Sequence, residues 1–275
     1  MASQDDMEGN QTLVGTFMKE LTSMREKLKD EDAEYVVSHY AGLEKSAVLQ
    51  ECRSFNDANF VSKRPSDCCE LLTKLLYLLA QGERFGSSEA TEVFFGVTRL
   101  FQSQHPMLRR MMYLFIKEVV EATAAEEVII VTSSLTKDVN SKTDLFRANA
   151  LRVLCKIIDG NMLGQIDRYI RQAIVDKDSM VSSSAIVSGH HLLNENTEIV
   201  RRWANDVQEA INNESSMVQY HALTLLYRIR QQDRLAVTKL VGKLSNGRTL
   251  HSPLATCMLI RYTSKLLQGE MSAKD

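Results

Sequence analysis

The apolar residues of this chain recur as a short pattern about every 36 residues. Each copy has a small or turn-forming residue, an apolar pair, a polar or small residue, and then an apolar stripe at helical spacing. A period of this length is typical of stacked helix pairs, because one pair cannot bury its own apolar face. We therefore expect an all-α fold, an α-solenoid of antiparallel helix pairs like those of HEAT and armadillo proteins. The equivalent positions, expected to be buried, are Leu108, Phe146, Val181, Val218 and Leu254.

Helical spacing and turn signals predict the order of the elements. A helix is expected over 43–55, then a connection at 60–65, because the residue before Pro65 is disfavoured in the α region. Asp67 and Glu70 resemble a capping box that opens a helix at 71–80, and Gly82 and Gly86 bracket the next turn. No segment shows the alternation expected of a strand. The remaining helices are expected at 87–101, 105–120, 126–138, 144–158, 162–175, 180–193, 198–211, 217–230, 233–244 and 254–267.

The first 42 residues differ from this pattern. Residues 1–10 are polar and predicted to be disordered, and apolar residues at helical spacing predict a short amphipathic helix over 11–29. We divide the chain into an N-terminal extension, 1–42, and a trunk, 43–275. The trunk pattern stops near Leu267 without the polar end unit that solenoids usually have, so we expect a fragment of a longer protein.

Composition and charge narrow the setting of the protein. Three prolines and 12 glycines among 275 residues suit a helical chain, since both residues weaken helix interiors. A formal net charge of −2 gives no electrostatic reason to expect binding to nucleic acid. No apolar run approaches the ~18 residues of a membrane span, and the first residues do not resemble a signal peptide. The five cysteines form no C-x-x-C pair, which favours a reducing, cytosolic setting.

Motifs for catalysis or metal binding are weak. Ser134 and Lys137 match a Ser-x-x-Lys pattern, but the partner motifs of serine acyl-transfer enzymes are missing. His190 and His191 are adjacent in a predicted helix, where neighbours point about 100° apart, so a structural role is favoured over a metal site. His221 lies among leucines and is expected to be packed or hydrogen-bonded. We therefore expect no catalytic residue, no cofactor and no metal.

Apolar residues that face outward give a better indication of function. In the helix at 87–101, Phe95 falls opposite the apolar stripe, and Arg99 lies beside it. In the helix at 126–138, Ile129 lies off the stripe next to Thr132 and Thr136. These helices are the second members of consecutive pairs, so their outer faces should lie side by side. An apolar spot rimmed by polar and charged groups indicates a protein-binding surface, although isolated exposed apolar residues are also common.

Several long segments of the sequence resemble the γ subunits of coatomer, the coat of COPI vesicles. They include LEKSAVLQ at 43–50, LTKLLYLL at 72–79, TRLFQS at 98–103, VIIVTSSLTKD at 128–138, RQAIVDK at 171–177, VQYHAL at 218–223 and DRLAV at 233–237. The likeness covers roughly 43–267, and a generic helical repeat would not produce such words. Residues 1–42 depart from the expected family pattern.

The resemblance implies a non-enzymatic coat subunit with an adaptin-like trunk. In that family the trunk pairs with the small ζ subunit, joins the other coatomer subunits, and is recruited to Golgi membranes by a GTP-loaded Arf-family GTPase. The implied setting is the cytoplasm, peripheral on Golgi membranes and COPI vesicles, in Golgi-to-ER and intra-Golgi transport. By likeness to the adaptor β chains, the helix at 127–138 contacts the GTPase switch regions. Ile129 and Thr132 then take the contacting positions, with Thr136, Phe95 and Arg99 around them.

Two other classes of function remain open from sequence. An armadillo-type peptide receptor would favour three-helix units and a ladder of groove asparagines, and the chain shows no such ladder. A catalytic helical-repeat enzyme would need titratable residues that converge in one cleft.

Overall fold

A computed structural model describes residue 40 and residues 42–122, 125–158, 160–246 and 250–271. The chain divides into two compact units, 1–48 and 49–275. In the first unit, the Leu43 amide donates a hydrogen bond to the Tyr40 carbonyl oxygen (3.3 Å), and the first turn of α2 begins at Lys45. The predicted disorder at 1–10 and the amphipathic helix at 11–29 lie outside the described residues.

The described residues form helices and no strands, as the pattern predicts. The elements are α2 (Lys45–Cys52), η1 (Arg53–Asn56), α3 (Ala58–Lys63), α4 (Pro65–Ala80), α5 (Ser87–Arg99), η2 (Leu100–Gln102), α6 (Pro106–Ala122), α7 (Ala125–Val139), α8 (Asp144–Ile157), α9 (Gly160–Ile174), α10 (Ser179–Glu195), α11 (Thr197–Arg201), α12 (Ala204–Ala210), α13 (Ser216–Arg230), α14 (Arg234–Asn246) and α15 (Pro253–Met271).

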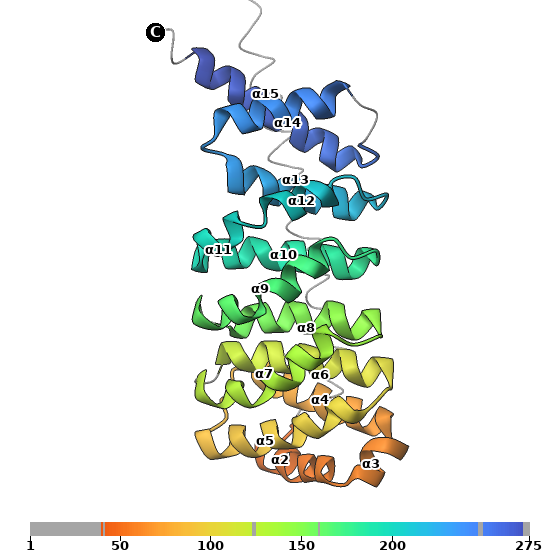
Figure 1. Cartoon of the computed structure of the whole chain (residues 1–275). Helices are drawn as coiled ribbons and strands as arrows, with labels where there is room; N and C mark the ends of the chain where they lie inside the picture. Colours follow the sequence, from red (N-terminus) through yellow and green to blue (C-terminus); the bar gives the residue numbers. More distant parts are fainter. Residues whose placement is uncertain (1–39, 41, 123–124, 159, 247–249, 272–275) are drawn as a thin grey trace, which may run out of the picture. The chain divides into compact units, whose positions relative to one another are not determined.

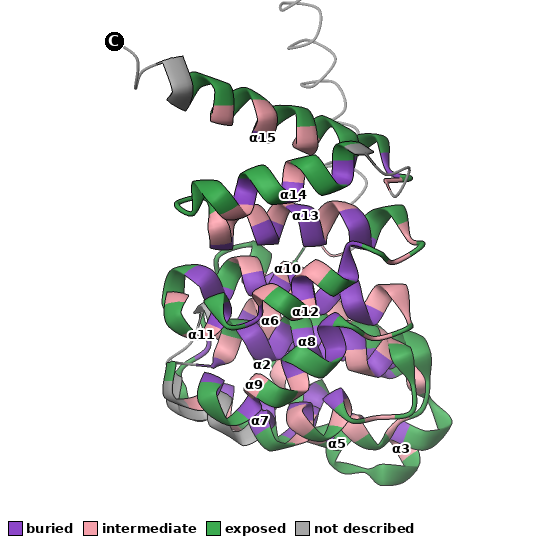
Figure 2. Cartoon of the chain, turned by 45° about the horizontal axis from the view of Figure 1, so that its top comes forward, coloured by how far each residue is buried: buried purple, intermediate pink, exposed green. Residues whose placement is uncertain are grey.

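The helices of the second unit stack in two rows (Figure 1). In the first row, α4, α6, α8, α10, α13 and α15 each pack on the next. In the second row, α5 packs on α7 and α9 packs on α12. Helices of the second row also pack on the first row: α7 on α8, α9 on α10, α12 on α13 and α14 on α15. Buried residues follow the region between the rows and between successive helices (Figure 2). The predicted α-solenoid is therefore confirmed.

Four of the five equivalent apolar positions are buried, and the fifth prediction is wrong. Leu108, Phe146, Val181 and Val218 are the third residues of their helices and are at most 4 % exposed. Leu254, in contrast, is 60 % exposed. Because α15 begins at Pro253, its third residue is Ala255, which is fully buried, and Leu254 corresponds to the exposed second position. The small size of Ala255 hid the true register, since the sequence pattern selects the larger apolar residue.

The start of the trunk also departs from the prediction. The segment expected to be a connection, 60–65, contains most of helix α3, and α4 begins at once with Pro65 in its first turn. Only Arg64 separates the two helices, with φ −127° and ψ 57°. The rule for residues before proline is therefore correct, but its effect is confined to one residue. Asp67 is not a capping residue; it lies in the first turn of α4 and pairs with Arg64 (3.3 Å).

The helix predicted over 198–211 is interrupted. α11 ends at Arg201 and α12 begins at Ala204, with Trp203 between them at φ −79° and ψ −1°. The indole of Trp203 is fully buried, and its Nε1 donates a hydrogen bond to Asp167 Oδ1 of α9 (2.5 Å). The interruption places this large side chain against α9 and α10 rather than along a helix face. Periodicity alone does not reveal such a break, since the flanking residues keep helical spacing.

Candidate protein-binding surface

The second-row helix α5 presents the exposed aromatic residue predicted from the sequence. Its start is fixed by Gly86, whose amide donates to Glu89 Oε2 (2.8 Å), after a turn in which Gly82 has a φ of +89°. Val93 and Val97 are buried, whereas Phe95 on the opposite side is 53 % exposed. An aromatic side chain this exposed is available to a protein partner.

Arg99 lies one helical turn beyond Phe95 and is exposed, as expected. Its Nη1 makes a long hydrogen bond to the Asn56 carbonyl oxygen (3.5 Å). Arg99 is thus loosely held at the edge of the surface, where its charge remains accessible to a partner.

Helix α7 lies beside α5, so the predicted juxtaposition of the two helices is confirmed. Val131, Leu135 and Val139 form its buried stripe, in agreement with the sequence pattern. Thr132, however, is only 8 % exposed, so the prediction that it faces outward is wrong. α7 packs against both α5 and α8, so more than one side of this helix is covered.

Thr136 and Ile129 are the other two residues of α7 that the sequence assigns to this surface. Thr136 is half-buried, and its hydroxyl donates to the Thr132 carbonyl oxygen (2.9 Å), a bond within the helix. Ile129 lies on the helical backbone of α7, but its side chain falls outside the described residues. The described part of the surface is therefore Phe95 and Arg99 on α5, with Thr136 on α7.

A buried charged cluster holds the end of α7 in place. The guanidinium of Arg109, 1 % exposed, donates to Asp138 and to the hydroxyl of Tyr113, and the same hydroxyl donates to Asp138 Oδ2 (2.7 Å). The Arg109 guanidinium carbon also lies 4.1 Å from the centre of the Phe146 ring on α8. Burial raises the pKa of Asp138, and its bonds to Tyr113 and Arg109 act in the opposite direction. The cluster therefore ties α6, the end of α7 and α8 together.

The spacing of arginine and aspartate residues along the sequence also indicates this cluster. Two copies of the 36-residue pattern have an arginine directly after the buried third residue of their helix. These are Arg109 in α6 and Arg147 in α8. Both pair with an aspartate 29 residues later, Asp138 and Asp176 respectively. A shared Arg-to-Asp spacing in successive repeats would have predicted these two ion pairs.

The remaining candidate chemical groups have structural partners. His190 is half-buried with Arg228 Nη1 3.3 Å from its Nδ1, while His191 is exposed. His221 Nδ1 lies 2.7 Å from the hydroxyl of Ser183. Across the described ranges, no three His, Cys, Asp or Glu residues are grouped as a metal site would require. Burial raises the pKa of the Cys52 and Cys155 thiols to about 12, which keeps them protonated and unreactive at neutral pH.

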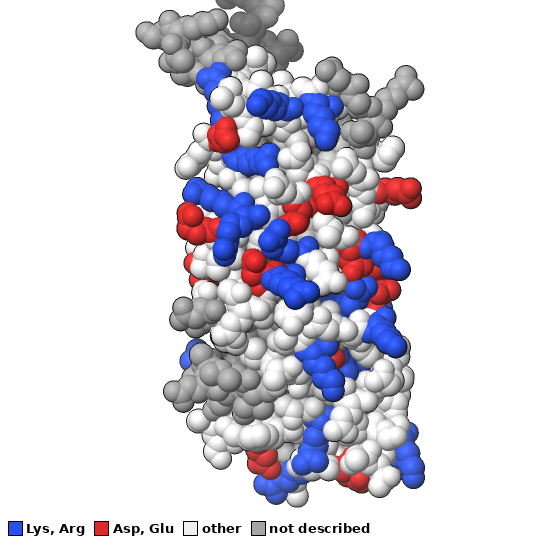
Figure 3. All heavy atoms as spheres, viewed as in Figure 1, with Lys and Arg blue, Asp and Glu red and all other residues white. Residues whose placement is uncertain are grey.

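Charges on the second-row face are mixed. Basic and acidic side chains alternate over the middle of the stack (Figure 3). Two of the ion pairs in this part of the chain join Arg171 to Asp206 (2.7 Å) and Arg201 to Glu198 (3.3 Å). Among the described residues, no helix is both long and apolar enough to span a bilayer.

These features define the class of the protein: a helical-repeat scaffold with an exposed aromatic residue on one of its second-row helices. The chain belongs to the family of the adaptin N terminal region, whose sequence profile matches residues 44–275. It is 60 % identical over 239 residues to coatomer subunit gamma of Arabidopsis thaliana, covering 87 % of this chain and 26 % of that protein. It is 54 % identical over 240 residues to coatomer subunit gamma-2 of Homo sapiens, covering 87 % and 27 %.

A similar likeness extends to Caenorhabditis elegans, where the probable coatomer subunit gamma is 54 % identical over 244 residues, covering 89 % of this chain and 27 % of the relative. The resemblance predicted from the sequence words is therefore confirmed. The chain spans about a quarter of the length of these relatives.

Proposed function

We propose that this chain acts as part of a structural, non-enzymatic subunit of the COPI coatomer. The observation that carries the proposal is the 60 % identity with a coatomer subunit gamma over 239 residues, 87 % of the chain. A stack of helix pairs suits this role, since it offers extended surfaces to several partners at once. The proposed partners are the other coatomer subunits, among them the small ζ subunit. The proposed location is the cytoplasm, peripheral on Golgi membranes and COPI vesicles, in Golgi-to-ER and intra-Golgi transport.

Recruitment in this proposal depends on a GTP-loaded Arf-family GTPase. Such GTPases order their switch segments in the GTP form, so a rigid surface can bind that form alone. The contact surface is formed by the outward side of α5 and the adjoining part of α7. Phe95 acts as the apolar anchor, Arg99 supplies a charge at the rim, and Ile129 is assigned by the family resemblance. Thr132 is left out of the contact because its side chain is buried.

The test compares binding of the GTP-locked and GDP-bound GTPase to the chain, measured by biolayer interferometry. Phe95→Asp is expected to weaken binding of the GTP form at least roughly tenfold, because a charge replaces a desolvated apolar anchor. Ile129→Asp is expected to have an effect of the same size. Arg99→Ala should act more mildly, mainly on the association rate and its salt dependence.

Leu114→Asp is the matched control for this experiment. Leu114 is also an exposed apolar residue, but it lies on α6 in the first row, away from the proposed surface. We expect this variant to bind the GTP form like the wild type. Circular dichroism and the unfolding midpoint must first show that all variants are folded. Equal binding of Phe95→Asp, Ile129→Asp and the wild type would move the contact to another part of the stack.

A further inference from the structure

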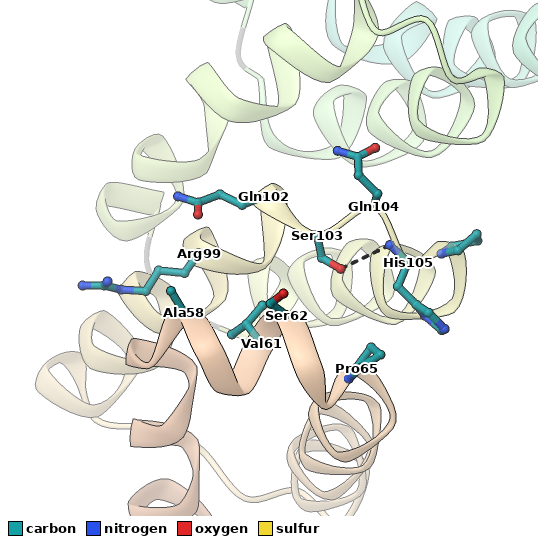
Figure 4. Close-up of a pocket in the computed structure, with 10 residues that line it drawn as sticks. Ala58, Val61, Ser62, Pro65, Arg99, Gln102, Ser103, Gln104 and His105 are labelled. Atoms are coloured by element: carbon teal, nitrogen blue, oxygen red, sulfur yellow. Dashed lines mark hydrogen bonds between the residues drawn. The ribbon is translucent and has the colours of Figure 1, made fainter.

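A groove lies between the start of the trunk and the loop that precedes α6. Its volume is about 790 Å³, within the range of ligand-binding clefts. One wall is α3, from which Ala58, Val61 and Ser62 face the segment formed by η2 and residues 103–105 (Figure 4). Pro65 and Pro106, the first residues of α4 and α6, line the groove as well.

The chemistry of the walls is suited to an extended peptide. Ala58, Pro65 and Pro106 supply accessible apolar surface, whereas Val61 behind them is only 6 % exposed, so a small apolar side chain can pack against the alanine and the prolines. Gln102 and Gln104 lie on the opposite side, where the Gln104 side chain points away from α3 (Figure 4), and neither amide makes a hydrogen bond with any part of the chain that the structure describes. Each amide offers both donors and an acceptor, which matches the alternating N–H and C=O groups of an extended backbone.

The charge in the groove selects the kind of peptide. Arg99 is the charged residue among those that line it, and no aspartate or glutamate does so. Among the described residues, the guanidinium of Arg99 has one hydrogen bond, the long bond to the Asn56 carbonyl oxygen, and it can pair with a carboxylate. The helix ends add to this field, because α4 and α6 both begin at the groove with the partial positive charge of their N-termini.

We propose that this groove binds an extended acidic peptide segment of a partner protein, with a carboxylate on Arg99 and a small apolar side chain against Ala58 and the prolines. In this arrangement the amide of Gln102 pairs with the backbone of the peptide. The proposal does not depend on binding of a GTPase. Arg99 belongs to both surfaces, so the test relies on a residue of the groove that is not part of the α5–α7 surface.

The test uses the whole chain and an array of octapeptides. In one set, Asp or Glu stands one to three positions from a Leu or Val; in matched sets, Lys or Gln replaces the acidic residue. Peptides of the acidic set are expected to bind at least tenfold more tightly than their Lys counterparts. Ser62→Glu, which places a carboxylate on the exposed wall, is expected to weaken that binding at least tenfold.

Ser66→Glu is the matched control, since Ser66 is also exposed and near α3 but does not line the groove. This variant is expected to bind the acidic peptides like the wild type. Equal binding of acidic and basic peptides, or undiminished binding by Ser62→Glu, would overturn the proposal. So would a chain that binds no peptide until Asp5, Asp6 and Glu8 are replaced by Asn, Asn and Gln, because its own acidic start would then be the occupant.

Discussion

Helices α10 and α15 hold corresponding places in the first row and differ in how much of their surface is covered. α10 lies between α8 and α13, and every residue from Val181 to Ile186 is buried. α15 packs on α13 and α14, and its Leu254, Ile260 and Leu267 are more than half exposed. Figure 2 shows this contrast between the two helices. In a solenoid, burial therefore depends on the neighbours along the stack more than on the polarity of the residue.

The polar residues of α10 illustrate the point. Ser182, Ser183 and Ser184 are consecutive and buried, although serine is mostly a surface residue. The hydroxyl of Ser182 donates to the Ile174 carbonyl oxygen, and that of Ser184 donates to the Met180 carbonyl oxygen, both at 2.7 Å. Each buried hydroxyl thus replaces its hydration with a protein partner, as the low polarity of the interior requires. These serines are buried, although serine usually predicts exposure, because α8 and α13 cover two sides of α10.

The largest effect that we expect from this contrast comes from a charge placed at one position in each helix. Val181→Asp should lower the free energy of unfolding by upwards of about 3 kcal/mol, because an unpaired carboxylate would be buried between α8 and α13. Leu254→Asp should change it by no more than about 0.5 kcal/mol, since the residue is exposed. Urea unfolding followed by circular dichroism measures both. Similar losses in the two variants would show that the end of the stack is covered after all.

Replacing a glycine by alanine is expected to have smaller effects on the free energy of unfolding, and these effects have opposite signs in α10 and α14. A Cβ at Gly189 of α10 would lie 2.8 Å from Leu225 Cδ2 and 3.4 Å from Trp203 Cζ3, both in buried side chains. Overpacking of this kind costs about 1–3 kcal/mol, and the better helix propensity of alanine offsets about 1 kcal/mol of it. Gly189→Ala should therefore destabilise the protein by about 1 kcal/mol.

Gly242 of α14 provides the matched control for the glycine substitution. Nothing lies within 4 Å of a Cβ built there, so Gly242→Ala should stabilise the protein by about 0.5–1 kcal/mol through helix propensity alone. Thermal unfolding midpoints of the two variants should shift in opposite directions from the wild type. A gain for Gly189→Ala would mean that α10 has room to move away from α13.

The smallest expected effect is a dependence on pH that originates in the central helices. Burial first, and then the charge of Arg228, lower the pKa of His190 to about 4, from about 6.5 in the unfolded chain. As pH falls below 6.5, His190 becomes protonated in the unfolded chain, whereas in the folded chain it remains neutral until about pH 4. Stability is thus complete above pH 6.5 and declines between pH 6.5 and 4, by less than the full value of the shift because the ring is only half-buried. Unfolding midpoints measured across this range test it.

His191 gives the control for the pH experiment because its ring is exposed. His190→Asn should flatten the slope of stability between pH 6.5 and 4, whereas His191→Asn should leave that slope unchanged. The charged and titratable groups that face His190 are Arg228 and His221 on α13 and His191 on its own helix. A slope that persists in His190→Asn would assign the effect to His221, whose pKa burial also lowers.

The sequence by itself determined the helical class, the repeat period, the core stripe of α5 and the exposure of Phe95. These follow from periodicity, because a helix turns by a constant angle per residue and its apolar face can be read locally. The pairing of α5 with α7 also followed, since consecutive repeats stack in order. The long words shared with coatomer γ subunits carried the family assignment.

Only the tertiary structure decided which flanks of each helix are covered. Thr132 is buried on a helix that packs against both α5 and α8, and Leu254 is exposed while Ala255 takes the inward position of α15. The groove between α3 and the loop before α6 joins residues tens of positions apart. Local periodicity gives the direction of a side chain around its own helix, but its burial depends on what another part of the chain places there.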